Sequence, residues 1–238
     1  LRVLSHATLV LQDWVRARVF AWMAGFLHFD KVMQIPLVVA HAYAGISYRD
    51  LIEMFSEGAF LGAGEFPLLE HVREFFREKA QDIQRGGVEY CHASQWLDVY
   101  WPVDEYMFIE LCTDEKLDAL YREAERALGL LFSSRGIEIP HALLHDAFCL
   151  NRQLIKLPFQ FQDRKVELSA NIGEFYRSII LGNPIELSKR RHVHQIACSA
   201  EVWMSWDEWY EKVVWYGNKS GAYLYGIRSV EIDLAGHY

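Results

Sequence analysis

The sequence lacks the short motifs by which many enzymes are identified. It contains no Gly-x-Ser-x-Gly elbow, no Walker loop and no His-Glu-x-x-His pair. The one Gly-Ala-Gly run, at residues 62–64, has neither a third glycine nor a preceding strand, both of which a dinucleotide-binding loop requires. No self-sufficient catalytic site is therefore visible in the sequence.

Cysteine is scarce and widely spaced. The four residues are Cys91, Cys112, Cys149 and Cys198, and their spacing excludes a compact Cys-x3-Cys-x2-Cys iron–sulfur loop. An even number permits two disulfides. Because the sequence shows no secretion signal, however, we expect reduced thiols and a cytoplasmic protein.

Positive charge is also in short supply. Lys and Arg total 24 against 32 Asp and Glu, so the net charge is −8. The only dense basic run is Lys189-Arg190-Arg191, and three such residues are more typical of a solvated turn than of a phosphate-binding surface. We expect no nucleic-acid partner.

Long uninterrupted apolar runs are absent. Arg16, Arg18, His28 and Asp30 divide the richest apolar stretch, which is shorter than the roughly 20 residues needed to cross a bilayer. We expect no membrane span.

Apolar residues are nevertheless abundant. They make up 52% of the 238 residues, and aromatics 14%, which favours a well-packed interior over disorder. Apolar residues recur with helical spacing over the first two-thirds of the chain, which predicts helices at 11–29, 36–45, 47–58, 68–85, 114–132 and 140–153. Thr113 is expected to cap the fifth of these helices. Pro102 interrupts an aromatic segment at 96–111.

The pattern of apolar and polar residues changes in the last third of the chain. Three segments alternate apolar and polar residues, at 158–168, 185–198 and 222–234, and a helix is predicted at 169–181 between the first two. The predicted fold is mainly α, a helical bundle-like body with a small β-sheet in the last third, or α+β by strict count. We expect one domain over residues 1–238.

The stretch from Trp203 to Tyr225 combines an aromatic helix with an aromatic strand. Ser205 and Glu208 form a capping-box pattern, and Gly217 is suited to end the helix. The polar corner that follows adds nothing to a core, so we interpret its residues as substrate-binding candidates: Tyr216, Asn218, Lys219 and Tyr223. Turn chemistry alone is the alternative explanation for Gly217-Asn218.

Histidines supply the only metal-like patterns. His141, His145 and Cys149 recur every four residues on one predicted helix, yet the sequence nominates no fourth ligand, so core or surface roles are the simpler interpretation and we assign no metal site. His192 and His194 would face one way on a strand. Beside three basic residues, they suggest an exposed edge.

Two pairs of neighbouring carboxylates could suggest acid–base chemistry. Asp104-Glu105 and Asp207-Glu208 each begin a predicted helix, where adjacent side chains diverge by about 100°. Negative charge at a helix N-terminus is the simpler role.

Several segments together resemble the carboxy-terminal region of cobalamin-dependent radical SAM enzymes, in which a B12-binding domain precedes a radical SAM barrel. The resemblance is carried by DWVRARVFAWMAGFLHFDKVMQIPLVVAH, WLDVYWPVDEYMFIEL, HDAFCLNR, VELSANIGEFYRSIILGNPIELSKR and EWYEKVVWYGNKSGAYLY. It implies a helical tail domain that closes the open end of the barrel and helps to shape the substrate pocket.

The same resemblance implies that the chemistry belongs upstream. The [4Fe-4S] cluster, S-adenosylmethionine and cobalamin would be held by the barrel and B12-binding domains of the same polypeptide, and no catalytic residue is carried over to this chain. Since the chain starts at Leu1 and enters directly into apolar sequence, we expect an excised C-terminal domain. Such a domain should expose an apolar patch near residues 14–27 or 96–108.

Two other functions stay open. The chain could be a free-standing helical ligand-binding or protein-interaction module that uses its aromatic faces. It could also be a metal-dependent enzyme built on His141, His145 and Cys149.

Overall fold

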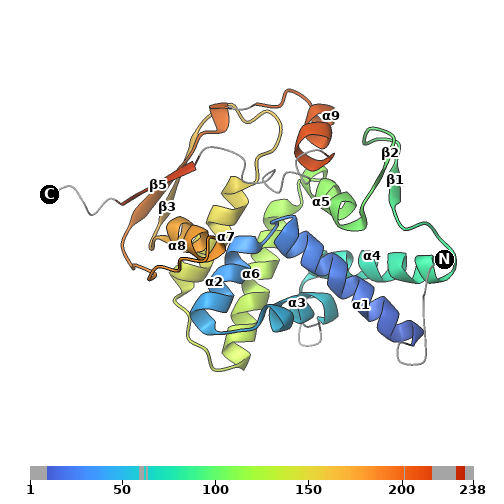
Figure 1. The fold of residues 1–238 in the computed structure, drawn as a ribbon, viewed down its shortest axis with the longest axis horizontal. Coiled ribbons are helices and arrows are strands. Elements are labelled where there is room, and N and C mark those ends of the chain that lie inside the picture. Colours follow the sequence, from blue (N-terminus) through green and yellow to red (C-terminus); the bar gives the residue numbers. More distant parts are fainter. Residues whose placement is uncertain (1–9, 59–61, 63, 201, 216–228, 234–238) are drawn as a thin grey trace. The chain divides into compact units, whose positions relative to one another are not determined.

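The computed structural model describes residues 10–58, 62, 64–200 and 202–215, and the backbone of 229–233 (Figure 1). It is mainly helical with two small antiparallel sheets, so the predicted fold class is confirmed. Within the single domain expected over 1–238, the chain is organised as two compact units. Unit 1 comprises residues 1–30 and 47–124, and unit 2 comprises residues 31–46 and 125–238.

Unit 1 is a helical layer with a short hairpin. Helix α1 packs against both α3 and α4, and the hairpin strands pair antiparallel with Cys91 opposite Trp101. Its elements are α1 (Leu11–Ala24), the π-helix η1 (Gly25–Phe29), α3 (Tyr48–Glu57), α4 (Pro67–Gln84), β1 (Cys91–Ala93), β2 (Val99–Trp101), α5 (Val103–Thr113) and the start of α6 (Leu117–Ser134).

An aromatic cluster forms the core of unit 1. The ring of Phe76 on α4 lies 6.0 Å from that of Trp22 and 6.2 Å from that of Phe26, and all three side chains are buried. Tilted and edge-on aromatic pairs contribute stabilising energy beyond that of the apolar area that they bury. The helical spacing of the sequence had indicated these inward faces.

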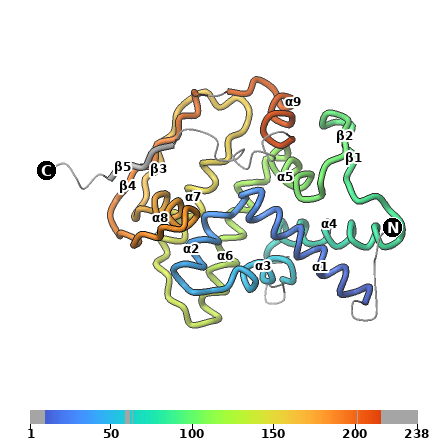
Figure 2. Tube along the Cα trace, viewed as in Figure 1, coloured from blue at the N-terminus to red at the C-terminus, as the bar shows by residue number. Residues whose placement is uncertain are grey.

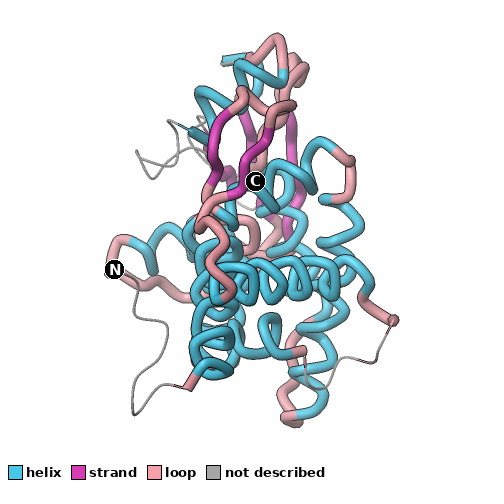
Figure 3. Tube along the Cα trace, turned by 90° about the vertical axis from the view of Figure 1, so that its right-hand side faces the viewer, coloured by secondary structure: helices cyan, strands magenta, loops and turns pink. Residues whose placement is uncertain are grey.

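Unit 2 contains a three-stranded antiparallel sheet together with several helices (Figures 2 and 3). The strand order is β3-β4-β5, which confirms the three alternating segments predicted in the last third of the chain. Its elements are α2 (Gln34–Ala44), the end of α6, α7 (His141–Leu154), β3 (Arg164–Leu168), α8 (Ile172–Ile180), β4 (His192–Ile196), η2 (Cys198–Ala200), α9 (Trp206–Trp209), the π-helix η3 (Tyr210–Trp215) and β5 (Ser229–Asp233).

Some local expectations were wrong. Thr113 does not cap α6: it is the last residue of α5, and its hydroxyl donates to the carbonyl of Ile109. A threonine within a helix readily bonds back to the carbonyl four residues earlier, and this competes with capping. The β1–β2 hairpin was missed because strands of three residues are too short to show alternation.

The capping box at the start of α9 is confirmed. The Ser205 hydroxyl accepts a hydrogen bond from the Glu208 amide at 3.1 Å, and the Glu208 carboxylate accepts one from the Met204 amide at 2.9 Å. The caps satisfy amides that a helix start leaves without partners. Helical structure then continues to Trp215, with the six residues from Tyr210 onward forming a π-helix.

Trp209 anchors this aromatic helix in the core of unit 2. The side chain is fully buried, and its indole N–H donates to the Lys156 carbonyl at 2.9 Å. Lys156 is itself buried: its ammonium donates to the Cys198 carbonyl at 2.6 Å and lies 4.7 Å from the Trp203 ring. The aromatic residues therefore act first as a packing unit, as the sequence indicated.

Asn151 joins α7 to the start of α2. Its side-chain oxygen accepts from the Ile35 amide at 2.9 Å, and its amide group donates to the carbonyls of Val32 and Lys31 at 2.8 and 3.0 Å. Asn151 is completely buried, and the first seven residues of α2 are also classed as buried, with Gln34 8% exposed. One amide side chain thus satisfies backbone groups that the apolar α2 cannot pair by itself.

No single helix in the described part of the chain has the length and apolarity to cross a membrane. The consecutive segments Leu11–Phe29 and Gln34–Ala44 pass that test only when taken together, on length and composition alone.

We predict that Asn151→Ala destabilises the protein by about 3–5 kcal/mol, because it leaves several buried backbone groups without partners. Urea unfolding followed by circular dichroism measures the change. Asn183→Ala is the matched control: Asn183 is exposed and bonds only locally, so its loss should stay within about 0.5 kcal/mol. Equal stability of the two variants would contradict the role given to Asn151.

Candidate functional site

The substrate-binding residues proposed from the sequence, Tyr216, Asn218, Lys219 and Tyr223, lie outside the described residues. The structure therefore does not test this prediction. A different feature of unit 1 offers a described site.

That feature is a groove along α1 and α3. Two adjoining cavities of about 350 and 540 Å³ share Phe20 and Arg49 in their walls, and together they form what we call the α1–α3 groove. One end is aromatic and the other charged. The lining residues are Asp13, Arg16, Ala17, Phe20, Ala24, His28, Phe29, Tyr48, Arg49, Ile52, Glu53 and Glu57.

The aromatic end is formed by three rings. The His28 ring lies edge-on to both Phe29 and Tyr48, at centroid distances of 5.2 and 5.6 Å. The Phe29 side chain is 69% exposed, although it belongs to an otherwise buried segment. An exposed ring at the rim of an apolar cavity is available to a ligand.

A π-helix presents His28 and Phe29 to the groove. In η1 the Asp30 amide donates to the carbonyl of Gly25, five residues back, at 2.7 Å. This wider turn rotates the following side chains relative to a continuous α-helix, and π-helical turns occur frequently at functional sites.

Gly25 has a packing reason to be glycine. A methyl group there would lie 2.2 Å from the Oδ2 atom of Asp104, in the first turn of α5. Asp104 thus packs directly against the π-helix, and its burial raises the pKa of that carboxyl. Asp104 therefore has a second role besides placing negative charge at the N-terminus of α5, because its side chain also packs against η1.

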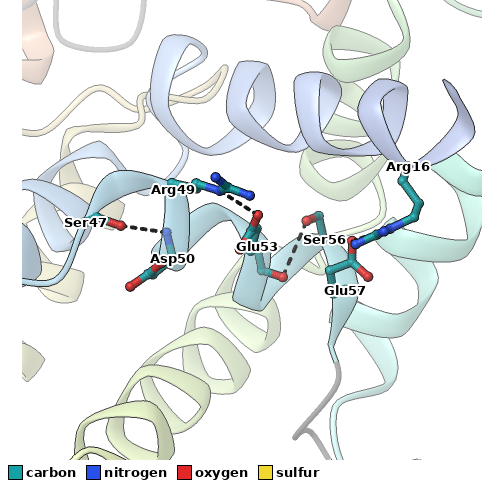
Figure 4. A network of polar contacts seen from close by, with 7 residues as sticks. All are labelled: Arg16, Ser47, Arg49, Asp50, Glu53, Ser56 and Glu57. Atoms are coloured by element: carbon teal, nitrogen blue, oxygen red, sulfur yellow. Dashed lines mark hydrogen bonds and ion pairs between the residues drawn. The ribbon is translucent and has the colours of Figure 1, made fainter. Parts of the chain in front are cut away.

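The charged end consists of ion pairs on the groove wall (Figure 4). Arg49 donates to Glu53 along α3 at 2.8 Å, and Arg16 of α1 reaches Glu57 of α3 at 3.1 Å. With Asp13, the groove holds three acids and two arginines, which leaves a net charge of −1. Ser47 fixes the start of α3, because its hydroxyl accepts from the Asp50 amide.

Burial keeps the two polar rings of the aromatic end neutral. It lowers the pKa of His28 and raises that of Tyr48, so at neutral pH the groove offers an uncharged imidazole and a phenol. Both groups can donate or accept a hydrogen bond. The groove can therefore bind a flat apolar body together with a neutral or cationic polar end.

The His141, His145 and Cys149 stripe does not close around a metal. The two imidazole rings stack at 6.2 Å, and His145 Nδ1 lies 3.1 Å from the Glu125 carboxylate, so His145 has a structural partner. Among the side chains that the structure describes, no three metal-ligating groups converge. His141 instead lines an open cavity of about 670 Å³ in unit 2, with Tyr43 and Lys189.

The cysteines do not fit an iron–sulfur cluster. Cys112 and Cys198 are buried, and burial raises the pKa of Cys91 to about 11 and that of Cys149 above its ordinary value. Cluster ligation requires thiolates that converge from one neighbourhood. Among the described residues, these cysteines do not join any group of three or more possible metal ligands.

The exposed apolar patch expected near residues 14–27 or 96–108 does not form along either segment. Trp22, Phe26 and Trp101 are buried. The exposed large apolar side chains are Leu97 and Tyr100 within 96–108, and Phe29 just beyond 14–27. Surface apolarity therefore gives no support to a missing partner.

Sequence reasoning did not single out the groove. Phe20, His28 and Phe29 were assigned to one continuous helix whose later turns are apolar most of the way round, and a π-turn leaves no distinct trace in hydrophobic spacing. The one available signal was Gly25 within a helical segment, since glycine in a helix indicates a close approach by another group.

No protein-family model matches the chain, and no curated protein matches it with significant similarity.

We predict that Gly25→Ala lowers the free energy of unfolding by about 1–3 kcal/mol, because the added methyl group must displace Asp104. Gly129→Ala is the matched control. Gly129 lies in α6 with open space around it, so alanine should stabilise by up to about 1 kcal/mol. Thermal unfolding of both variants measures the difference, and a stabilising Gly25→Ala would contradict the packing described.

Proposed function

We propose that this chain is the C-terminal, substrate-binding part of a cobalamin-dependent radical SAM enzyme, and that the α1–α3 groove forms a wall of its substrate pocket. The observation that carries the proposal is the position of the aromatic end. Phe20, His28 and Phe29 all belong to residues 13–41, the first segment of the resemblance, and they line a cavity. The helical fold is compatible with such a tail domain.

The groove suggests a substrate class. Its rings suit a flat apolar body, and its charge of −1 disfavours a second negative group close to Asp13 and Glu53. A substrate with an apolar body and a neutral or cationic polar end fits best. Methyl transfer or related radical chemistry would then act on the part that projects from the groove.

In this proposal the partners are the radical SAM barrel and B12-binding domains of the same polypeptide. Those domains would supply the [4Fe-4S] cluster, S-adenosylmethionine and cobalamin, and this chain's residues would bind and orient the substrate. The four cysteines are free thiols, which fits a location in the cytoplasm.

A free-standing ligand-binding module is the second candidate. One observation favours it: every residue of the α1–α3 groove belongs to unit 1 of this chain, so the described site needs no other domain to form. Binding by the isolated chain is therefore expected under both candidates. Turnover is expected only under the first candidate, and only in the longer protein that includes the barrel.

We predict that the isolated chain binds benzamidine, a flat cationic probe, more tightly than benzoate, its anionic counterpart. Phe29→Ala should weaken benzamidine binding by about 3- to 10-fold, the equivalent of one aromatic contact. Saturation-transfer NMR titration measures the affinity. Phe159→Ala is the control, because Phe159 is similarly exposed but lies outside the groove. Equal loss in both variants, or a preference for benzoate, would contradict the proposed site.

The enzymatic proposal is tested in the full reading frame. We predict a Cys-x3-Cys-x2-Cys stretch upstream of Leu1, and S-adenosylmethionine cleavage by the anaerobically reconstituted longer protein. In that protein Lys219→Ala should reduce single-turnover activity while changing stability by no more than about 0.5 kcal/mol. Trp209→Ala, by contrast, should cost about 3–5 kcal/mol, because it removes a fully buried indole.

The outcomes separate the candidates. A reading frame with no such cysteine stretch would overturn the enzymatic proposal and leave the binding module. Full activity with Lys219→Ala would mean that the polar corner after Trp215 only ends the helix and does not bind the substrate.

A further inference from the structure

The basic run and the two histidines that follow it have different surroundings in unit 2. The exposed edge expected for His192 and His194 was wrong, because β4 lies between β3 and β5, and β5 is distant in sequence. Their exposed fractions are 4% and 2%. The basic run at 189–191 does stay exposed, and its first residue, Lys189, lines the cavity of about 670 Å³ that His141 also lines.

This cavity, which we call the α6–α7 cavity, belongs entirely to unit 2. Its walls come from the end of α2, the end of α6, the connection to α7, the first turn of α7 and the segment before β4. Its volume falls within the range of about 300–1,000 Å³ that is usual for small-molecule sites. The cavity therefore has the size of a ligand site that needs no other domain.

The connection between α6 and α7 builds an apolar wall of the cavity. The Gly136 amide donates to the Ser133 carbonyl at 3.1 Å, and the Ile137 amide donates to the Phe132 carbonyl at 2.9 Å. With the φ of 65° at Gly136, these bonds form a Schellman motif, which turns the chain back toward the last turn of the helix. Phe132 and Ile137 both line the cavity, so a turn that one glycine permits sets this wall.

Apolar and charged residues occupy different depths of the cavity. Phe132 and Leu144 are 1% and 5% exposed, so they lie at its inner end. Lys189, Glu138 and His141 are exposed and lie at its rim. A molecule that fits this order has an apolar body inside and a polar end at the rim, where water still reaches its charges and the cost of burying them is avoided.

The rim carries one charge of each sign. Neither Lys189 nor Glu138 has an ion-pair partner among the residues that the structure describes. The Ser133 hydroxyl donates to the Gly129 carbonyl at 2.9 Å, so its oxygen can only accept from a ligand. Glu138 and Ser133 thus offer acceptors, while Lys189, from a separate segment, offers donors. A simple anion or cation leaves one of the two charges unused, whereas a head group with an ammonium and a carboxylate uses both.

We propose that the α6–α7 cavity binds a small zwitterion with an apolar body, of the α-amino acid class. Its carboxylate pairs with Lys189 and its ammonium with Glu138, and its apolar side chain lies inward against Phe132. The phenol of Tyr43 and the imidazole of His141 can each donate or accept a further hydrogen bond at the rim. The proposal is independent of the radical SAM assignment, because the cavity shares no residue with the α1–α3 groove.

Titration calorimetry of the chain with L-leucine and two analogues tests the proposal. Isocaproate is leucine without the ammonium, and isoamylamine is leucine without the carboxylate. We expect leucine to bind more tightly than either analogue by about 2- to 5-fold, which corresponds to one exposed charge pair. Lys189→Met should remove the advantage of leucine over isoamylamine and keep that over isocaproate. Glu138→Gln should do the reverse.

Lys165→Met is the matched control. Lys165 is also an exposed lysine of unit 2, but it lies outside the cavity, so the affinity for leucine should be unchanged. Phe29→Ala, in the α1–α3 groove, should leave that affinity unchanged as well. No leucine binding at millimolar concentration, or tighter binding of either analogue, would overturn the proposal. An equal loss in Lys165→Met and Lys189→Met, or a loss in Phe29→Ala, would place the ligand elsewhere and overturn it too.

Discussion

The buried amide of Asn151 is the interaction that ties the segment 31–46 to the rest of unit 2. Helix α2 is buried over its first seven residues, which are apolar except for Gln34, and it has no side-chain cap of its own, so another element must satisfy its first amides. Asn151 of α7 does this and also binds the carbonyls of the preceding turn. The segment 31–46 is thereby committed to unit 2, although the sequence on both sides of it belongs to unit 1.

The assignment of residues 31–46 to unit 2 affects the backbone at the candidate site. Once residues 31–46 belong to unit 2, the end of the first helix must stop at Asp30, and the chain does so through a π-helix closed by the Asp30 amide. The wider turn needs a close neighbour for support, and Asp104 supplies it by packing on Gly25. The groove residues His28 and Phe29 follow from that backbone geometry. The candidate groove therefore includes the last residues of the first segment of unit 1.

Histidines illustrate how burial changes an interpretation. By composition, His192 and His194 beside Lys189-Arg190-Arg191 resemble an exposed edge, and Arg191 is indeed exposed and paired with Glu167. The pairing of β5 with β4 converts the same two residues into buried groups opposite two acids. His141 and His145, which have the more recognisable spacing, stay on the surface of α7.

The sequence by itself determined most of the helices, the serine caps of α3 and α9, and the three-strand sheet. These depend on local spacing and on single residues such as Ser47 and Ser205, whose hydroxyls bond amides three residues away. Only the tertiary structure decided that the chain crosses between two units, that Gly25 receives Asp104 and that β4 is central. Each of these is a contact between residues distant in sequence, and hydrophobic periodicity records which face is buried but not what covers it.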